Sequence, residues 1–88
     1  MSSSPEITPQ QTHPLEVSDR QIVDGLLATT VPTDAHLVDA ARLLMRYSGF
    51  PGAEELQRDL AKAIKLWGLS RDELNARCRE IWSSGYRP

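Results

Sequence analysis

The sequence predicts an all-α protein of four short helices, at about 19–28, 34–48, 51–67 and 71–83. Three observations support this fold class. Apolar residues recur at three- and four-residue steps in each range, which is the spacing of one helix face. Glycines at 49, 68 and 85 stand where these patterns stop, as suits the left-handed residue that follows a helix. No stretch alternates long enough to indicate a strand.

The helix at 19–28 is predicted from a capping box, in which Ser18 covers the first free amides and Gln21 reaches back. Its expected buried stripe consists of Ile22, Val23, Leu26 and Leu27. Thr29, Thr30 and Val31 are β-branched, and Pro32 disfavours a helical residue before it. A connector is therefore expected up to about Thr33.

The helix at 34–48 is predicted to start after Thr33, a good N-cap, with Asp34 at the positive end of the helix dipole. More than half of its circumference is apolar, as in a central helix that touches two neighbours. The expected buried residues are Leu37, Val38, Ala40, Ala41, Leu44, Met45 and Ser48, with Asp39, Arg42 and Arg46 facing solvent and Leu43 off the stripe.

Between the second and third ranges, Gly49 suits a helix end and Pro51 suits the first turn of the next helix. The helix at 51–67 is expected to bury Leu56, Leu60, Ala63, Ile64 and Trp67. Gly68 then provides a stop, and Ser70 with Glu73 forms a second capping box. The helix at 71–83 is expected to bury Leu74, Cys78, Ile81 and Trp82.

The chain of 88 residues is expected to form a disordered arm at 1–14 and a single helical domain at 15–88. The arm holds three prolines and one large apolar residue, Ile7, too few apolar groups to offset the entropy of ordering. No stretch approaches the about 20 apolar residues of a membrane span, so no membrane insertion is expected. Cys78 is the only cysteine, which favours a reducing compartment, the cytoplasm by default.

Composition and motifs exclude several classes of function. Ten basic and twelve acidic side chains give a net charge of −2, which disfavours nucleic acid as a partner. His13, His36 and Cys78 do not share the spacing of a metal site, and Cys78 lies on an apolar helix row, where a buried thiol is expected. We therefore expect no enzyme activity, no catalytic residue, no metal and no cofactor; His36 is interpreted as a solvated or capping residue.

A helix-turn-helix is the alternative interpretation, because residues 63–74 contain a helix end, a Gly-Leu-Ser turn and a capped helix start. Two features oppose it. Ile64 stands where the crossing of the two helices favours a small residue, and the would-be recognition helix opens with Arg71, Asp72 and Glu73. A DNA-binding regulator that uses the third and fourth helices is nevertheless kept as the second hypothesis.

Arginines and aromatic residues indicate where a protein partner would bind, because these types are enriched at interface hot spots. They gather around the central turn and at the end of the chain. Phe50 and Trp82 could instead plug the ends of a thin core, and a second copy could complete that core, so a homodimer is also considered. The predicted partner-binding residues are Arg42, Arg46, Tyr47, Phe50, Trp82 and Tyr86.

Several short motifs in order resemble a small cyanobacterial family of unknown function. They are His13-Pro14, Asp19-Arg20-Gln21-Ile22-Val23, Arg46-Tyr47-x-Gly49-Phe50-Pro51-Gly52-Ala53, Leu56-Gln57-Arg58-Asp59-Leu60 and Trp67-Gly68-Leu69. The resemblance covers about residues 12–82 and implies a short, all-helical, cytosolic cyanobacterial protein without an assigned activity or cofactor. Leu43, Leu44 and Met45 depart from the more polar, arginine-containing stretch of the family. The resemblance supplies no function, and the arginine and aromatic clusters motivate the hypothesis of a non-catalytic protein-interaction or adaptor module.

Overall fold

A computed structural model describes residues 13–86 and shows four α-helices, with no strand in that range. The helices are α1 (Glu16–Leu27), α2 (Asp34–Tyr47), α3 (Glu54–Leu66) and α4 (Arg71–Ser83). The predicted all-α class and the number of helices are confirmed. None of the described helices is long and apolar enough to cross a membrane.

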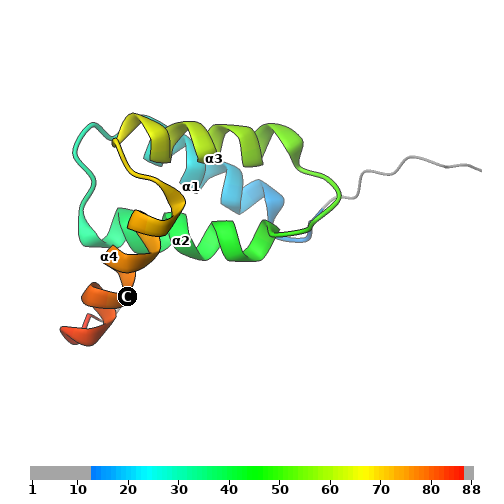
Figure 1. Cartoon of the computed structure of the whole chain (residues 1–88). Coiled ribbons are helices and arrows are strands. Elements are labelled where there is room, and N and C mark those ends of the chain that lie inside the picture. Colours follow the sequence, from blue (N-terminus) through cyan, green and yellow to red (C-terminus); the bar gives the residue numbers. More distant parts are fainter. Residues whose placement is uncertain (1–12, 87–88) are drawn as a thin grey trace, which may run out of the picture.

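Three of the helices form an up-down-up bundle, and the fourth lies outside it. α2 and α3 run in opposite directions, with α1 behind them in the view of Figure 1. α4 descends from the end of α3, crosses α2 and projects beyond it with its C-terminal half (Figure 1). α4 packs chiefly against α2, so α2 is the central helix with a bundle on one side and α4 on the other. The largest fully buried apolar side chains are Val23, Leu26, Leu43, Tyr47, Leu56, Leu60 and Leu74.

α1 begins three residues before the predicted start, and its N-cap is Leu15 without a side-chain cap. The expected capping box is wrong, since Ser18 donates its hydroxyl to the Leu15 carbonyl at 3.1 Å instead of capping a helix start. Asp19, in the first turn of α1, is 1% exposed, and its carboxylate accepts hydrogen bonds from Arg46 and Tyr47 of α2.

The turn between α2 and α3 is longer than predicted, because Pro51 does not open α3. Ala53 adopts a left-handed conformation with φ of 52°, and regular helix begins only at Glu54. The side-chain amide of Gln57 donates to the carbonyls of Phe50, at 3.3 Å, and Gly52, at 2.6 Å. These hydrogen bonds from Gln57 stabilise the Phe50–Ala53 backbone in a non-helical conformation.

The predicted stops and caps elsewhere are confirmed. Gly49 and Gly68 have φ of 76° and 74°, the left-handed values that a helix end requires. Ser70 and Glu73 form the predicted capping box of α4. Thr33 is the N-cap of α2, and His36 completes its capping box, since Nδ1 of His36 accepts the backbone N–H of Thr33 at 3.0 Å.

The buried face of α2 is rotated from the predicted stripe. Leu43, expected off the stripe, is 2% exposed, whereas Met45, expected inside, is 76% exposed. The face of α2 that contains Ala40, Leu43 and Tyr47 is buried against the bundle, and α4 covers a separate face that contains Val38. Trp82 in α4 was also expected to be buried and is 49% exposed, and Ile22 in α1 is half-exposed.

The described residues begin within the predicted arm at 1–14. His13, assigned to the arm at 1–14, has its ring 5.0 Å from that of Tyr47 and 5.3 Å from that of Phe50, between centroids. Its Nδ1 also accepts the backbone N–H of Leu15 at 3.1 Å. The rest of the predicted arm, residues 1–12, lies outside the described residues.

Candidate functional site

The candidate site is a crevice of about 510 Å³ between the second half of α2 and one flank of α4. α4 crosses α2 (Figure 1), and the side chains that line the hollow come from both helices. Partly and fully buried apolar groups of both helices form its floor. The residues lining the crevice are Val38, Ala41, Arg42, Met45, Asn75, Cys78, Arg79 and Trp82.

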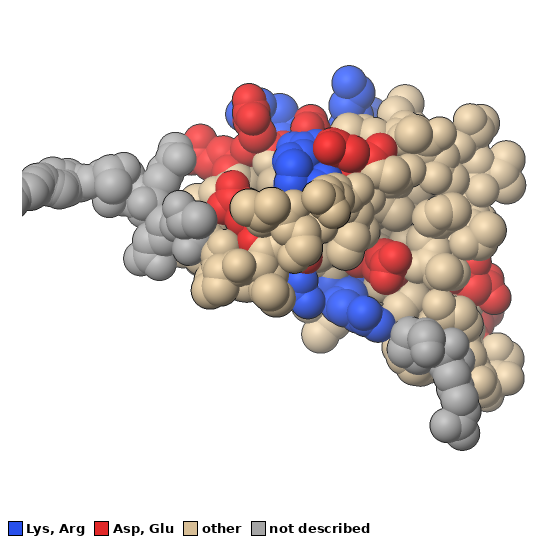
Figure 2. Space-filling view, turned by 180° about the vertical axis from the view of Figure 1, so that it is seen from behind, with Lys and Arg blue, Asp and Glu red and all other residues tan. Residues whose placement is uncertain are grey.

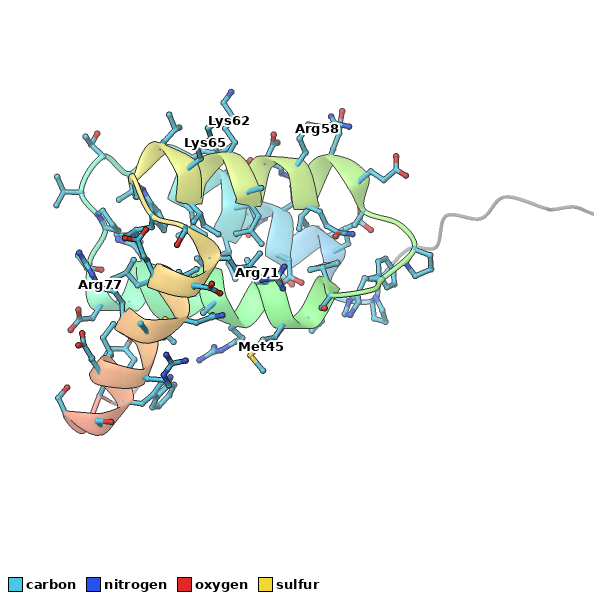
Figure 3. All side chains as sticks on the ribbon, viewed as in Figure 1. Met45, Arg58, Lys62, Lys65, Arg71 and Arg77 are labelled. Carbon is cyan, nitrogen blue, oxygen red and sulfur yellow. The ribbon has the colours of Figure 1, made fainter. Side chains whose placement is uncertain are left out.

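Large apolar side chains reach the surface at the rim of this crevice. Figure 3 shows Met45 on the side of α2 that points away from α3, and Trp82 of α4 lines the same crevice. Both are accessible to solvent, although thioether and indole groups are favoured in water-free surroundings. Tyr86, just after α4, packs edge-on against Trp82 at 5.7 Å between ring centroids and supports that wall.

The charged groups of the crevice are all cationic. Arg42 and Arg79 are exposed and lie on opposite walls, and no Asp or Glu lines the hollow. Among the residues that the structure describes, neither arginine forms an ion pair. The crevice is therefore an apolar hollow with two unneutralised guanidinium groups at its edge.

A second, smaller hollow continues the same surface between α2 and α3. Its two parts, of about 280 and 210 Å³, share Leu44, Ala61 and Arg71 in their linings. Lys65 lines the smaller part, and again no carboxylate is present. Figure 3 shows Arg71 between α2 and α3. Because Arg71 and Asn75 are one turn apart on α4, as Leu44 and Ala41 are on α2, the two hollows adjoin.

The structure divides the six predicted partner residues between the two sides of α2. Arg42 and Trp82, which the sequence placed in separate patches, meet in the crevice, with Tyr86 behind Trp82. Arg46 and Tyr47 instead bind Asp19 of α1. The Tyr47 hydroxyl donates to Oδ2 of Asp19 at 2.8 Å, and Nη1 of Arg46 donates to Oδ1.

This buried contact explains Arg46, Tyr47 and Phe50 by folding. Tyr47 is 2% exposed, so its ring is inaccessible to a partner. Burial, and after it the hydrogen bond to Asp19, raises the pKa of Tyr47, which keeps the hydroxyl a donor. Phe50 packs edge-on against Tyr47 at 5.6 Å between centroids. The aromatic and arginine excess around the central turn therefore joins α1 to α2.

Sequence reasoning missed three features of the site. Met45 and Arg79 were not among the predicted partner residues, since Met45 was assigned to the core and Arg79 was only noted beside Trp82. Asn75 was not considered. The available signal was the row Arg71, Asn75, Arg79 at four-residue steps on one flank of α4. The sequence alone did not show that this flank faces an open part of α2.

The crevice floor contains the lone thiol, whose surroundings make it unreactive. Cys78 is 7% exposed, and its Sγ donates to the Leu37 carbonyl at 3.3 Å. Burial raises the pKa of this thiol, so the nucleophilic thiolate is disfavoured. Within residues 13–86, no group of three His, Cys, Asp or Glu side chains is placed to hold a metal ion.

The α3–α4 hairpin is the part of the structure that the helix-turn-helix alternative would use. α4 turns its buried row of Leu74, Cys78 and Ile81 toward the core, and its main helix contact is α2. Asp72 and Glu73 are exposed in its first turn. The hydrogen bonds that Glu73 exchanges with Ser70 lower the pKa of Glu73, so this carboxylate stays charged.

The fold and the crevice define a small all-α protein that consists of a three-helix bundle with an appended helix and an apolar, cationic hollow beside it. The chain belongs to the family described as Protein of unknown function (DUF3288), whose model matches residues 10–87. The resemblance to a family of unknown function is thereby confirmed. No curated protein and no solved structure matches the chain.

Proposed function

We propose that this protein is a non-catalytic protein-interaction module that binds its partner in the α2–α4 crevice. The observation that carries the proposal is the rim of the crevice, where Met45 and Trp82 are exposed beside Arg42 and Arg79. Exposed apolar groups grouped in a hollow and edged by charges are typical of binding surfaces, whereas single exposed apolar residues are ordinary.

The absence of catalysis is part of the proposal, and the state of Cys78 supports it. The thiol donates a hydrogen bond to a backbone carbonyl and has a raised pKa. A nucleophilic cysteine needs the opposite, a lowered pKa and access to substrate. The expected cytoplasmic location and cyanobacterial origin also belong to this proposal, with the lone cysteine and the family resemblance as their support.

The test is site-specific photocrosslinking in the strain that carries the gene. A photoreactive amino acid at Met45 should give crosslinks to a defined protein, and the crosslinked segment is identified by mass spectrometry. The same amino acid at Lys62, exposed on α3 and outside the crevice, is the matched control. If position 45 gave no protein crosslink beyond that of position 62, the proposed function would be wrong.

DNA binding is the second candidate, and one observation favours it. Arg58, Lys62 and Lys65 lie at i, i+4 and i+7 on α3, all exposed, and none has an ion-pair partner within the described chain. Figure 3 shows Arg58 and Lys62 on the side of α3 that points away from α2. Such a row could follow a phosphate backbone.

This alternative predicts binding to duplex DNA at low salt that weakens steeply as salt rises. Arg71→Ala or Arg77→Ala, in the would-be recognition helix, should then reduce it. Retention on heparin and fluorescence anisotropy with labelled duplex DNA measure both. Elution in the void of a low-salt heparin column would dismiss the DNA-binding function.

A further inference from the structure

We infer that the occupant of the crevice is an acidic amphipathic helix of another protein. This inference rests on the proposed function and adds the chemistry of the partner. It follows from the charge of the lining, the shape of the hollow and the poor match of the surface to its own copy.

The first step is charge. The chain as a whole has a net charge of −2, yet the charged side chains that line the crevice and the adjoining α2–α3 hollow are all cationic. None of these cations forms an ion pair within residues 13–86. A carboxylate placed beside them would gain charge-assisted hydrogen bonds, and two guanidinium groups favour bidentate contacts. The four cations are Arg42, Lys65, Arg71 and Arg79.

The second step is the position of the apolar groups. Met45 and Trp82 are exposed, whereas Val38 and Cys78, which line the same crevice, are buried, and both arginines line it as well. An occupant therefore needs apolar side chains that enter the crevice and acidic side chains that remain at its edges. This division of one segment into an apolar face and a charged face is the pattern of a helix bound in a groove.

The third step is length. Arg71, Asn75 and Arg79 follow one another at four-residue steps along the same flank of α4, which is about 12 Å of helix. Each of the three lines one of the adjoining hollows. The surface is thus a track along α4 rather than a single hole, and an extended rod of helix matches it better than one protruding side chain.

A second copy of the chain matches this surface poorly. In a two-fold dimer the same patch contacts itself, so Arg42 and Arg79 would meet only the cations of the partner copy. Like charges across an interface oppose association. A lipid bilayer is also a poor match, because the apolar groups line a hollow between two helices, whereas membrane-surface proteins present a convex apolar face to lipid.

The experiment uses the full chain and three synthetic helical peptides of about 18 residues, long enough to hold a helix. The first has leucines on one face and glutamates on the others. The second has the same composition in an order that disperses the leucines, and the third has lysine in place of every glutamate. Binding is measured by fluorescence anisotropy of labelled peptide, and the contact is mapped by the NMR signals of the Met45 methyl and the Trp82 indole.

The expected result is binding of the first peptide only, with shifts at Met45 and Trp82. Arg79→Glu and Met45→Glu should each weaken binding by about tenfold or more, since each removes an anchor and adds repulsion. Arg58→Glu, the matched charge reversal of an exposed cation on α3, should change the affinity by less than about twofold. Thermal unfolding of each variant confirms that it is folded.

Several results would overturn the inference. The dispersed or lysine peptide could bind as well as the first, or Arg58→Glu could weaken binding as much as Arg79→Glu. Binding of anionic vesicles without peptide binding would indicate that the surface binds lipid. Self-association that Met45→Glu abolishes would indicate that it binds a second copy of the chain. If position 45 crosslinks a segment that is neither acidic nor amphipathic, this inference fails while the proposed function stands.

Discussion

The rear face of the bundle and the α2–α4 crevice both contain charged side chains, but they differ in whether those charges are paired within the chain. On the rear face, acidic and basic side chains are interspersed (Figure 2), and Arg20 bridges Asp24 at 2.7 Å and Asp59 at 2.9 Å. In the crevice, Arg42 and Arg79 have no such partners among the described residues. Charges that join helices are matched within the chain, whereas the crevice arginines are free to pair with the partner that we propose.

The largest expected effect lies in the bundle, at the buried carboxylate. Asp19→Ala leaves the Tyr47 hydroxyl and the Arg46 guanidinium without their acceptor, and it should lower the free energy of unfolding by about 3 kcal/mol. Urea denaturation followed by circular dichroism measures the loss. Asp24→Ala, which removes an exposed partner of Arg20, should cost less than about 1 kcal/mol. Equal losses would mean that Asp19 is no special link.

A slightly smaller effect is expected where α4 meets the bundle. Leu74 is fully buried in the first turn of α4, and Leu74→Ala should cost about 2 to 3 kcal/mol through lost burial and a cavity. Because α4 packs chiefly against α2, part of this loss should appear as local detachment of α4. Alkylation of Cys78 should then be at least about tenfold faster than in the native chain, at constant helicity of the bundle. Unchanged alkylation would show that α4 does not open separately.

Alkaline pH should destabilise both regions through two protonated groups. Burial raises the pKa of Cys78 above its ordinary 9.0, and burial with the Asp19 contact raises the pKa of Tyr47 above its ordinary 10.0. The folded chain therefore holds both protons more tightly than the unfolded chain. Their contribution to stability is complete below pH 9 and is lost as the pH rises through the folded values.

The measurement is the free energy of unfolding between neutral pH and strongly alkaline pH, for the native chain and for Tyr47→Phe. The Phe variant lacks the hydroxyl and should show a shallower decline above pH 10. If both chains declined equally, ionisation of Tyr47 would not contribute.

A further bundle contact predicts a smaller loss. The indole N–H of Trp67, at the end of α3, donates to the Thr29 carbonyl at 2.9 Å and ties α3 to the α1–α2 connector. Trp67→Phe should cost about 1 kcal/mol for this hydrogen bond, plus a lesser packing term. Thermal unfolding measures it. A fully stable variant would show that the connector does not depend on this bond.

The smallest effect on stability is expected in the crevice, and this prediction sharpens the contrast. Arg42→Gln and Met45→Gln alter exposed side chains and should change the free energy of unfolding by less than about 0.5 kcal/mol. Chemical denaturation of the two variants beside Asp19→Ala checks it. A loss above 1 kcal/mol would mean that the crevice residues serve folding after all.

The accuracy of the sequence prediction differed between helix ends and helix faces. Ser70 with Glu73, Thr33, and the glycines at 49 and 68 were assigned correctly, because capping and left-handed backbone depend on a few neighbouring residues. The predicted start of α1 was wrong. Ser18 to Gln21 has the residue pattern of a capping box, but these residues lie inside the helix, and Asp19 among them binds Tyr47 of α2.

The candidate site was half predictable. Arg42 and Trp82 were selected by residue type, but so were Arg46 and Tyr47, which prove to bind Asp19 inside the fold. Residue type cannot separate an arginine that pairs with a buried acid 27 positions away from one that faces solvent. That difference is set by the packing of α1 on α2, which leaves no local pattern.

The sequence by itself determined that this protein has four helices, where most of them stop, and which residues cap two of them. These features arise from backbone geometry and short-range hydrogen bonds within a few residues. Only the tertiary structure decided which face of α2 is buried and that Asp19 joins α1 to α2. It also decided that α2 and α4 leave the crevice between them. Each of these depends on which helix lies opposite, and an amphipathic stripe does not name its neighbour.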